Sequence, residues 1–257
     1  MGDFMMGLLF TFVLGIFILI GAFIVFVMKN NDKFVQFSIS VAFGVMSALV
    51  LGELIPETFE LFHTQYTTLK SFVLILICTL LGISILRLLD FFVPDHEMEE
   101  ESEKEHDHQL AHIGLVSSIA LVLHNIIEGM AVYSTVTKSV QLGLLVSIGV
   151  GLHNIPLGMV ITSTFYKSNK NKKKTISILL GIALSTFVGG IIMYFLAGKV
   201  INDTILAVLL GITLGMLFYI ILFELWPQIK KAKDKKTTVL GILLGVGILL
   251  ISLFIGE

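Results

Sequence analysis

Two apolar stretches of the sequence carry the same polar motif, 29 positions apart: HNIIEGM, which begins at His124, and HNIPLGM, which begins at His153. His124 and Glu128 are four positions apart, so in a helix they lie on one face. Imidazole nitrogens and carboxylate oxygens are typical ligands of Zn²⁺ and similar first-row divalent ions. The pattern therefore predicts a metal site shared by the two stretches, and Asn125 and Asn154 can add amide oxygens to it.

The surroundings of these motifs are those of a membrane protein. The chain has 257 residues, of which 56% are hydrophobic and only 14% charged, and its mean hydropathy is +0.96. A soluble domain of this size needs more polar surface. Runs of about 20 apolar residues are typical of membrane-spanning helices. Eight such runs predict an all-α membrane protein: 4–28, 34–62, 71–92, 113–135, 139–166, 175–198, 204–229 and 237–256.

The two motifs lie about midway along the fourth and fifth runs. A short connection, residues 134–139, joins these runs, so the two helices must be antiparallel neighbours, and His124, Glu128 and His153 can meet near the middle of the membrane. A lone histidine or asparagine can also simply hydrogen-bond a neighbouring helix. We interpret the doubled motif as functional because an ionisable group at the bilayer centre costs at least ~2.5–3.5 kcal/mol.

Basic residues mark one side of the membrane. Fourteen of the 17 lysines and arginines fall in or beside the connections that join runs 1–2, 3–4, 5–6 and 7–8. The positive-inside rule therefore predicts that these connections face the cytosol and that both termini lie outside. This topology also explains the lysine-rich stretch KSNKNKKK, residues 167–174, without a nucleic-acid partner.

The longest connection, residues 94–112, holds eight acidic residues and four histidines: His96, His106, His108 and His112. Its composition is typical of a solvated, disordered linker. Clustered imidazoles and carboxylates also suit weak binding of divalent cations, although their spacing follows no fixed pattern. Both interpretations of this loop stay open.

A second repeat joins the second and seventh runs, which carry GELIPE around Glu53 and FELWPQ around Glu224. These helices enter the membrane from opposite sides, so a shared motif indicates an inverted-topology repeat, which is common among transporters. We interpret Glu53 and Glu224 as carboxylates that attract a cation at the outer and inner mouths of a pathway. In the alternative interpretation, proline ends each helix and glutamate lies among the headgroups; Glu57 and Glu60 fit that alternative better.

These motifs resemble those of the ZIP (Zrt/Irt-like) divalent metal transporters of bacterial type. His124, Asn125 and Glu128 match the metal ligands of the family's fourth helix, and His153 and Asn154 match the fifth-helix pair. HNxxEG on the fourth helix is the specific part of the match, and the shared Glu-Leu-x-Pro supports it. The resemblance covers nearly the whole chain.

The resemblance has implications beyond the site. It implies a single transmembrane transporter domain, 1–257, in which runs 1–3 and 6–8 are related by an inverted repeat around runs 4 and 5, a 3+2+3 bundle. A divalent ion would pass through runs 2, 4, 5 and 7 of a plasma-membrane protein toward the cytosol, and a homodimer is expected. Zn²⁺ is the first choice of substrate, while Fe²⁺, Mn²⁺ and Cd²⁺ also suit these ligands. No cofactor is implied.

The chain departs from the family pattern, HNxPEG on both helices, at three positions. Ile127 replaces the first proline, Leu157 replaces the second glutamate, and Thr186 stands where many members carry a glutamate on the sixth helix. In the family those acids help to form a second metal position. We therefore expect one metal site, with Glu128 as its carboxylate.

Two other classes of function stay open on the sequence alone. Two histidines, one carboxylate and a free position also describe the zinc centre of an intramembrane hydrolase. However, HExxH is absent, and the repeated Glu-Leu-x-Pro has no role in such an enzyme. A metal sensor that lost conduction together with the missing acids would bind ions without moving them.

Overall fold

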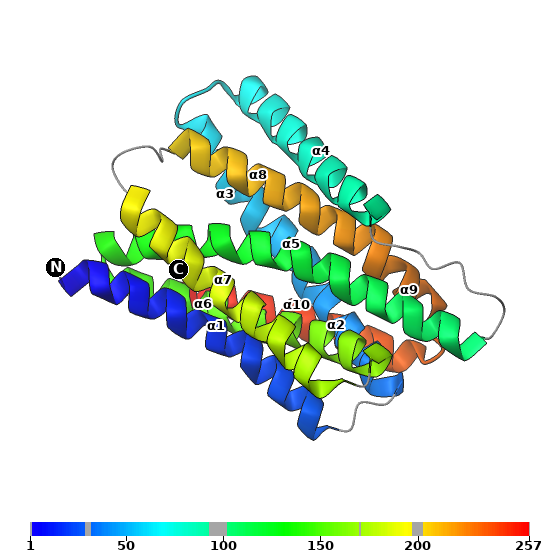
Figure 1. Cartoon of the computed structure of the whole chain (residues 1–257). Coiled ribbons are helices and arrows are strands. Elements are labelled where there is room, and N and C mark those ends of the chain that lie inside the picture. The colour runs from blue at the N-terminus through cyan, green and yellow to red at the C-terminus, as the bar shows by residue number, and fades with distance from the viewer. Residues whose placement is uncertain (1, 29–31, 93–101, 170, 197–202, 257) are drawn as a thin grey trace.

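The computed structural model describes residues 2–28, 32–92, 102–169, 171–196 and 203–256. Within these ranges the regular secondary structure is entirely helical. Eight helical segments of this described part are long and apolar enough to cross a membrane, and Figure 1 shows them side by side in one elongated bundle. The predicted all-α class and the eight spans are confirmed.

Six spans are single α-helices, and the other two are each interrupted by a π-helical segment. The single helices are α1 (Gly2–Val27), α4 (Thr68–Phe92), α5 (Ser102–Lys138), α6 (Val140–Asn169), α7 (Lys172–Leu196) and α10 (Lys235–Gly256). The second span consists of α2 (Asp32–Leu49), η1 (Val50–Leu54) and α3 (Ile55–His63). The seventh consists of α8 (Asp203–Tyr219), η2 (Ile220–Leu225) and α9 (Trp226–Lys231).

Helices are the stable form here because the hydrocarbon core offers no partner for a free N–H or C=O. Large apolar side chains cover the outside of the bundle, and their exposed fraction reaches 84% for Phe254 on α10 and 76% for Leu69 on α4. Buried hydroxyls bond within their own helix, as where Thr162 Oγ1 donates to the Gly158 carbonyl over 2.6 Å. Hydroxyls bonded in this way need no water, whereas others in the described part, among them those of Ser117, Thr186 and Thr213, are buried without a partner.

Four pairs of spans touch through glycine: α1 with α6, α5 with α7, α2 with α10, and α4 with α8. Each helix of a pair contributes one glycine to the contact. A Cβ added at either glycine would collide with a backbone carbonyl of the other helix, and that carbonyl belongs to the residue three positions before the other glycine. The two spans of each pair are both odd-numbered or both even-numbered along the chain, so they cross the membrane in the same direction. Small residues permit such close approach between membrane helices. The pairs are Gly21 with Gly158, Gly129 with Gly189, Gly44 with Gly245 and Gly82 with Gly215.

The two motif-bearing helices occupy the centre of the bundle. α5 and α6 pack on each other, α6 also contacts α2, and α5 contacts α8 and η2. The buried share of both central spans is 67%, against 28% for the spans formed by α4 and α10. Side chains at the middle of α5 and α6 are therefore enclosed by other helices and shielded from lipid.

The first residue of α5 is Ser102, inside the segment 94–112 that the sequence predicted to be a loop. Residues 102–113 contain neither proline nor glycine, so their sequence does not oppose this earlier helix start. Residues 93–101 lie outside the described residues, as do the side chains of the four histidines on which the metal-binding interpretation rested: His96, His106, His108 and His112.

Candidate metal centre

Three of the predicted ligands come together between the central helices. His124 and Glu128 stand one turn apart on α5, and His153 faces them from α6. A ligand atom from each of the three lies within 4.8 Å of the other two. Their exposed fractions are 4%, 9% and 1% respectively, so the group is closed off from solvent. The predicted convergence of two imidazoles and one carboxylate is present.

Glu128 joins the members of this group. Its Oε1 accepts a hydrogen bond from His153 Nε2 over 3.0 Å and lies 3.5 Å from His124 Nε2. Its Oε2 accepts a second bond from Asn154 Nδ2, also over 3.0 Å. An ionised carboxylate only accepts, so His153 Nε2 carries the proton of that bond, and in a neutral ring His153 Nδ1 then holds the lone pair.

Several atoms of the group have unused bonding capacity. His124 Nε2, His153 Nδ1 and Asn154 Oδ1 are buried and make no hydrogen bond. An unpaired buried polar atom costs about 1–3 kcal/mol, and here three lie on neighbouring residues of one site. A divalent cation beside Glu128 satisfies an atom such as His124 Nε2, because it accepts lone pairs from imidazole nitrogens and from oxygens at the same time.

The spacing of Glu128 Oε1 from the two imidazoles fits a small tetrahedral ion. Zn²⁺ binds nitrogen and oxygen at about 2.0–2.2 Å, which sets neighbouring ligand atoms of a tetrahedron ~3.3–3.5 Å apart. Glu128 Oε1 lies 3.0 Å from His153 Nε2 and 3.5 Å from His124 Nε2, and these two distances bracket the ligand–ligand distance of such a tetrahedron. Small side-chain shifts would thus convert the hydrogen-bonded group into a coordination shell.

The remaining motif positions lie around this core in different environments. Asn125 reaches α7, where its Nδ2 donates to the Ile182 carbonyl over 3.3 Å, and its Oδ1 has no partner. Thr186, also on α7, is fully buried with an unpartnered Oγ1. Leu157 is fully buried in the apolar core. The two positions at which the family carries further acids thus hold a hydroxyl and a hydrocarbon side chain.

The two Glu-Leu-x-Pro motifs coincide with the two π-helical segments. Glu53 lies in η1, and Glu224 lies in η2 with an exposed fraction of 7%. Proline has no N–H to donate four residues back, and the helix adapts through a wider turn. In both segments the N–H of the residue before proline donates a hydrogen bond to the carbonyl five residues earlier. These bonds run from Ile55 N–H to the Val50 carbonyl and from Trp226 N–H to the Ile221 carbonyl. Both spans continue beyond the proline as α3 and α9, so the alternative that proline ends these helices is wrong.

Acidic residues of the second span extend the centre toward one end of the bundle. Glu53 interacts electrostatically with all three residues of the centre. Glu57, one turn further along, interacts with Glu53 and with Glu128. By the sequence, Glu57 fitted the headgroup alternative better than Glu53 did, yet its interaction with Glu128 brings it into the surroundings of the centre. The spacing of Glu53, Glu57 and Glu60 along one helical face was the available signal.

Comparison with known proteins supports the interpretation of these motifs. A family model described as ZIP zinc transporter matches residues 93–253, which is more than half of the chain. The chain belongs to the ZIP zinc transporter family. The matched region contains both His-Asn motifs and the second Glu-Leu-x-Pro.

Curated relatives of this ZIP protein align over nearly its whole length. The zinc transporter ZupT of Xanthomonas axonopodis pv. citri is 31% identical over 90% of this chain and 86% of its own. ZupT of Streptococcus mutans is 30% identical over 92% of each chain, and ZupT of Clostridium perfringens is 29% identical over 99% of this chain and 97% of its own. ZIP membership supports metal transport, and not enzymatic catalysis, as the function of this multi-pass membrane protein.

Proposed function

We propose that this ZIP protein transports Zn²⁺ across the plasma membrane toward the cytosol, through the centre formed by His124, Glu128 and His153. The observation that supports this most is the convergence of two imidazoles and one carboxylate, within 4.8 Å, on the two central spans. The relatives named above are described as zinc transporters. Fe²⁺, Mn²⁺ and Cd²⁺ suit the same donors and are the competing substrates to test.

The centre binds one ion in this proposal. His124, Glu128 and His153 are the core ligands, and the amide oxygens of Asn125 and Asn154, which make no hydrogen bond, complete the shell. With neutral imidazoles, a single carboxylate leaves a net charge of +1 on the ion and its ligands, which favours release over tight retention. A potential of 100 mV adds ~4.6 kcal/mol for a divalent ion, at ~2.3 kcal/mol per charge.

The pathway leads from Glu53 through the centre to Glu224. Glu53 interacts electrostatically with the centre, which suits a carboxylate that attracts the ion at the outer mouth. Glu224 occupies the corresponding position in η2 of the seventh span, where it accepts the ion near the inner mouth. Around this line α2 contacts α6, α6 contacts α5, α5 contacts α8, and η1 also contacts α8.

A 3+2+3 inverted repeat organises this single transporter domain. The repeat exchanges spans 1–3 with spans 6–8, and span 4 with span 5. Under this exchange the α1–α6 pair becomes the α7–α5 pair, and the α2–α10 pair becomes the α8–α4 pair. All four pairs share the same reciprocal glycine register. The same exchange maps η1 onto η2, each of which ends two residues before a proline. Equivalent packing on both halves is what such a repeat requires.

The orientation follows from charge. The basic connections lie in the cytosol and both termini lie outside, as the positive-inside rule indicates. Transport toward the cytosol then runs from the end of the bundle that carries the termini to the end that carries the lysines. A homodimer stays a prediction of the family resemblance.

Zinc uptake by proteoliposomes tests the proposal. Purified wild-type protein should accumulate radiolabelled zinc, and Glu128→Gln, which keeps the shape but removes the charge, should abolish uptake because only two neutral imidazoles remain. Asp203→Asn, the same change at an exposed position at the start of α8, is the matched control and should transport normally. Wild-type protein that binds zinc without flux would instead indicate a sensor, and unimpaired Glu128→Gln would place the pathway elsewhere.

A further inference from the structure

Two connections between spans meet at the end of the bundle that carries the lysines. Asp32, the first residue of α2, forms an ion pair with Lys167 near the end of α6, over 2.7 Å. Lys172, the first residue of α7, lies over the ring of Phe26 near the end of α1, 4.8 Å from the ring centroid. The ends of α1 and α2 therefore lie beside the ends of α6 and α7.

The connection between the seventh and eighth spans belongs to the same region. Lys33 of α2 interacts electrostatically with Asp234, which directly precedes α10. Trp226 of α9 stacks on Phe43 of α2, with ring centroids 5.8 Å apart. Three connections that are far apart in the sequence are thus brought together around α2.

Lysines dominate this region, which we call the basic surface: residues 32–33, 167, 172–174 and 230–236. It contains ten lysines and only two acids. Both acids already have partners, since Asp32 pairs with Lys167, and Asp234 accepts hydrogen bonds from the N–H and the hydroxyl of Thr237. Every lysine of the surface except Lys167 is exposed. The basic surface therefore presents a large excess of positive charge.

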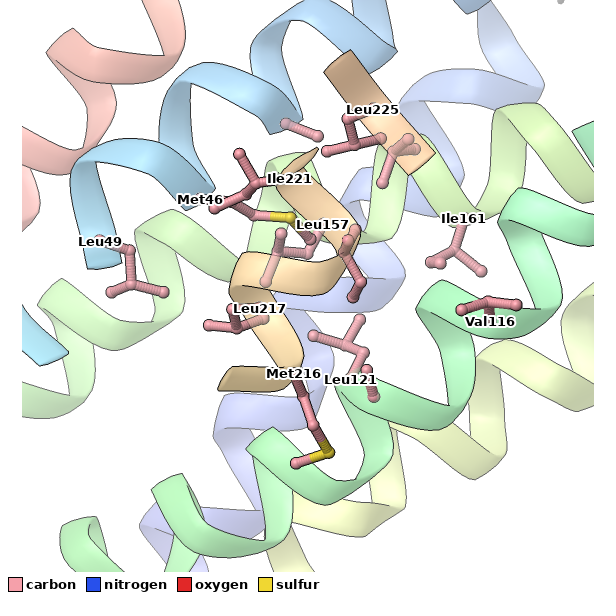
Figure 2. Close-up of a cluster of buried hydrophobic side chains, with 14 of the residues drawn as sticks. Met46, Leu49, Val116, Leu121, Leu157, Ile161, Met216, Leu217, Ile221 and Leu225 are labelled. Atoms are coloured by element: carbon pink, nitrogen blue, oxygen red, sulfur yellow. The ribbon is translucent and has the colours of Figure 1, made fainter. Parts of the chain in front are cut away.

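The basic surface begins where the apolar core ends. Figure 2 shows Ile161 of α6 and Leu225 of η2 among the buried apolar side chains. Lys167 follows Ile161 by six positions and Lys230 follows Leu225 by five, which are helical steps of ~8–9 Å. Lys230 lies over Trp226, which is 40% exposed, and tryptophan is enriched at the level of the lipid headgroups. These lysines therefore lie at the height of the lipid phosphates.

We propose that the basic surface binds the phosphate groups of anionic phospholipids in the leaflet on its side of the membrane. The positive-inside rule accounts for lysines beside each span, but it does not require three connections to join into one surface that is so poor in acids. Clusters of about four to eight basic residues beside membrane helices are typical of anionic-lipid binding. The proposal goes beyond the proposed function and does not depend on it.

Lipid binding to the purified protein tests this proposal. Native mass spectrometry in a neutral detergent compares phosphatidylglycerol with phosphatidylcholine of the same acyl chains. Wild-type protein should bind the anionic lipid at least ~5-fold more tightly, because each lysine near the headgroups adds to the attraction. Equal binding of the two lipids would overturn the proposal. A micelle has no inner and outer side, so a change of membrane orientation cannot imitate the result.

Charge-removing variants locate the lipid on the basic surface. Lys172→Gln, Lys173→Gln and Lys174→Gln, combined in one chain, should weaken phosphatidylglycerol binding about tenfold. The same three positions changed to arginine are the matched control and should keep the affinity, because arginine retains the charge and the donors. Lys70→Gln, at an exposed position of α4 near the opposite end, should also keep it. Unchanged binding by the glutamine variant would contradict the proposal.

Two measurements on the wild type keep the proposal testable if the glutamine variant does not fold. Binding of phosphatidylglycerol should weaken several-fold as salt is raised, since salt screens exposed charges, and binding that is insensitive to salt would overturn the proposal. Inorganic phosphate at the concentration of the lipid should not displace it. Displacement would show that the surface binds free phosphate instead of lipid. None of these measurements uses zinc, so they stand apart from the test of transport.

Discussion

Glu128 contacts His153, Asn154 and His124 through its two oxygens. An ion that binds Glu128 must therefore replace hydrogen bonds that its oxygens already accept. Binding through Nε2 of His153 requires its proton to move to Nδ1, which is buried and has no other partner. The tautomer change keeps the ring neutral. The group can therefore hold either its own hydrogen bonds or an ion without a net change of charge on its side chains.

Restoring an acid at Leu157 should strengthen metal binding. Leu157→Glu places a second carboxylate one turn from His153, and we expect the zinc dissociation constant to fall on the order of tenfold, which corresponds to ~1.4 kcal/mol. Titration calorimetry gives both affinity and stoichiometry, and a second bound ion would also agree. Leu157→Gln is the neutral control and should gain little. Equal behaviour of the Glu and Gln variants and the wild type would contradict the single-carboxylate account.

The convergence of the imidazoles was predictable, while the finer contacts were not. The i,i+4 spacing of His124 and Glu128, with a short connection to the helix of His153, fixes which faces can meet. Whether an amide oxygen or its NH2 group turns inward depends on packing, and the bond from Asn154 to Glu128 could not be read from spacing. The contact of Asn125 with α7 likewise depends on how closely two glycines let α5 and α7 approach.

At the scale of elements, the sequence predicted all eight spans because long apolar runs have few other stable forms in a membrane. It did not predict η1 and η2. Pro56 and Pro227 indicate a disturbed helix, yet packing decides whether the chain breaks, kinks or widens into a π turn. Gly129 and Gly158, the glycines of the two repeated motifs, bring their helices close to α7 and α1 respectively.

The glycine contacts lead to a stability prediction with a control on the same helix. Gly189→Ala places a methyl group against the Ile126 carbonyl of α5, and overpacking of this kind destabilises by about 1–3 kcal/mol. Gly181→Ala meets nothing within 4 Å and should be neutral or slightly stabilising, since alanine favours helix over glycine. Thermal unfolding in detergent measures both. Equal melting temperatures for the two variants would show that α5 and α7 do not depend on this contact.

At the scale of the whole molecule, two opposite arrangements of charge face each other across the centre. Carboxylates line the second span toward the end that carries the termini, and lysines crowd the connections at the other end. The lysines orient the protein during insertion, while the carboxylates concentrate cations at the entrance. The direction of transport thus depends on which end faces the cytosol, and a labelling experiment decides it.

Single cysteines introduced at the two ends report the orientation in intact cells. Thr67→Cys, exposed between α3 and α4, should react with a membrane-impermeant maleimide, whereas Lys173→Cys, exposed at the start of α7, should react only after the cells are permeabilised. The parent chain is the control, because its one cysteine, Cys78, is buried and should stay unlabelled. The reverse pattern would put the lysines outside. The carboxylate entrance would then face the cytosol.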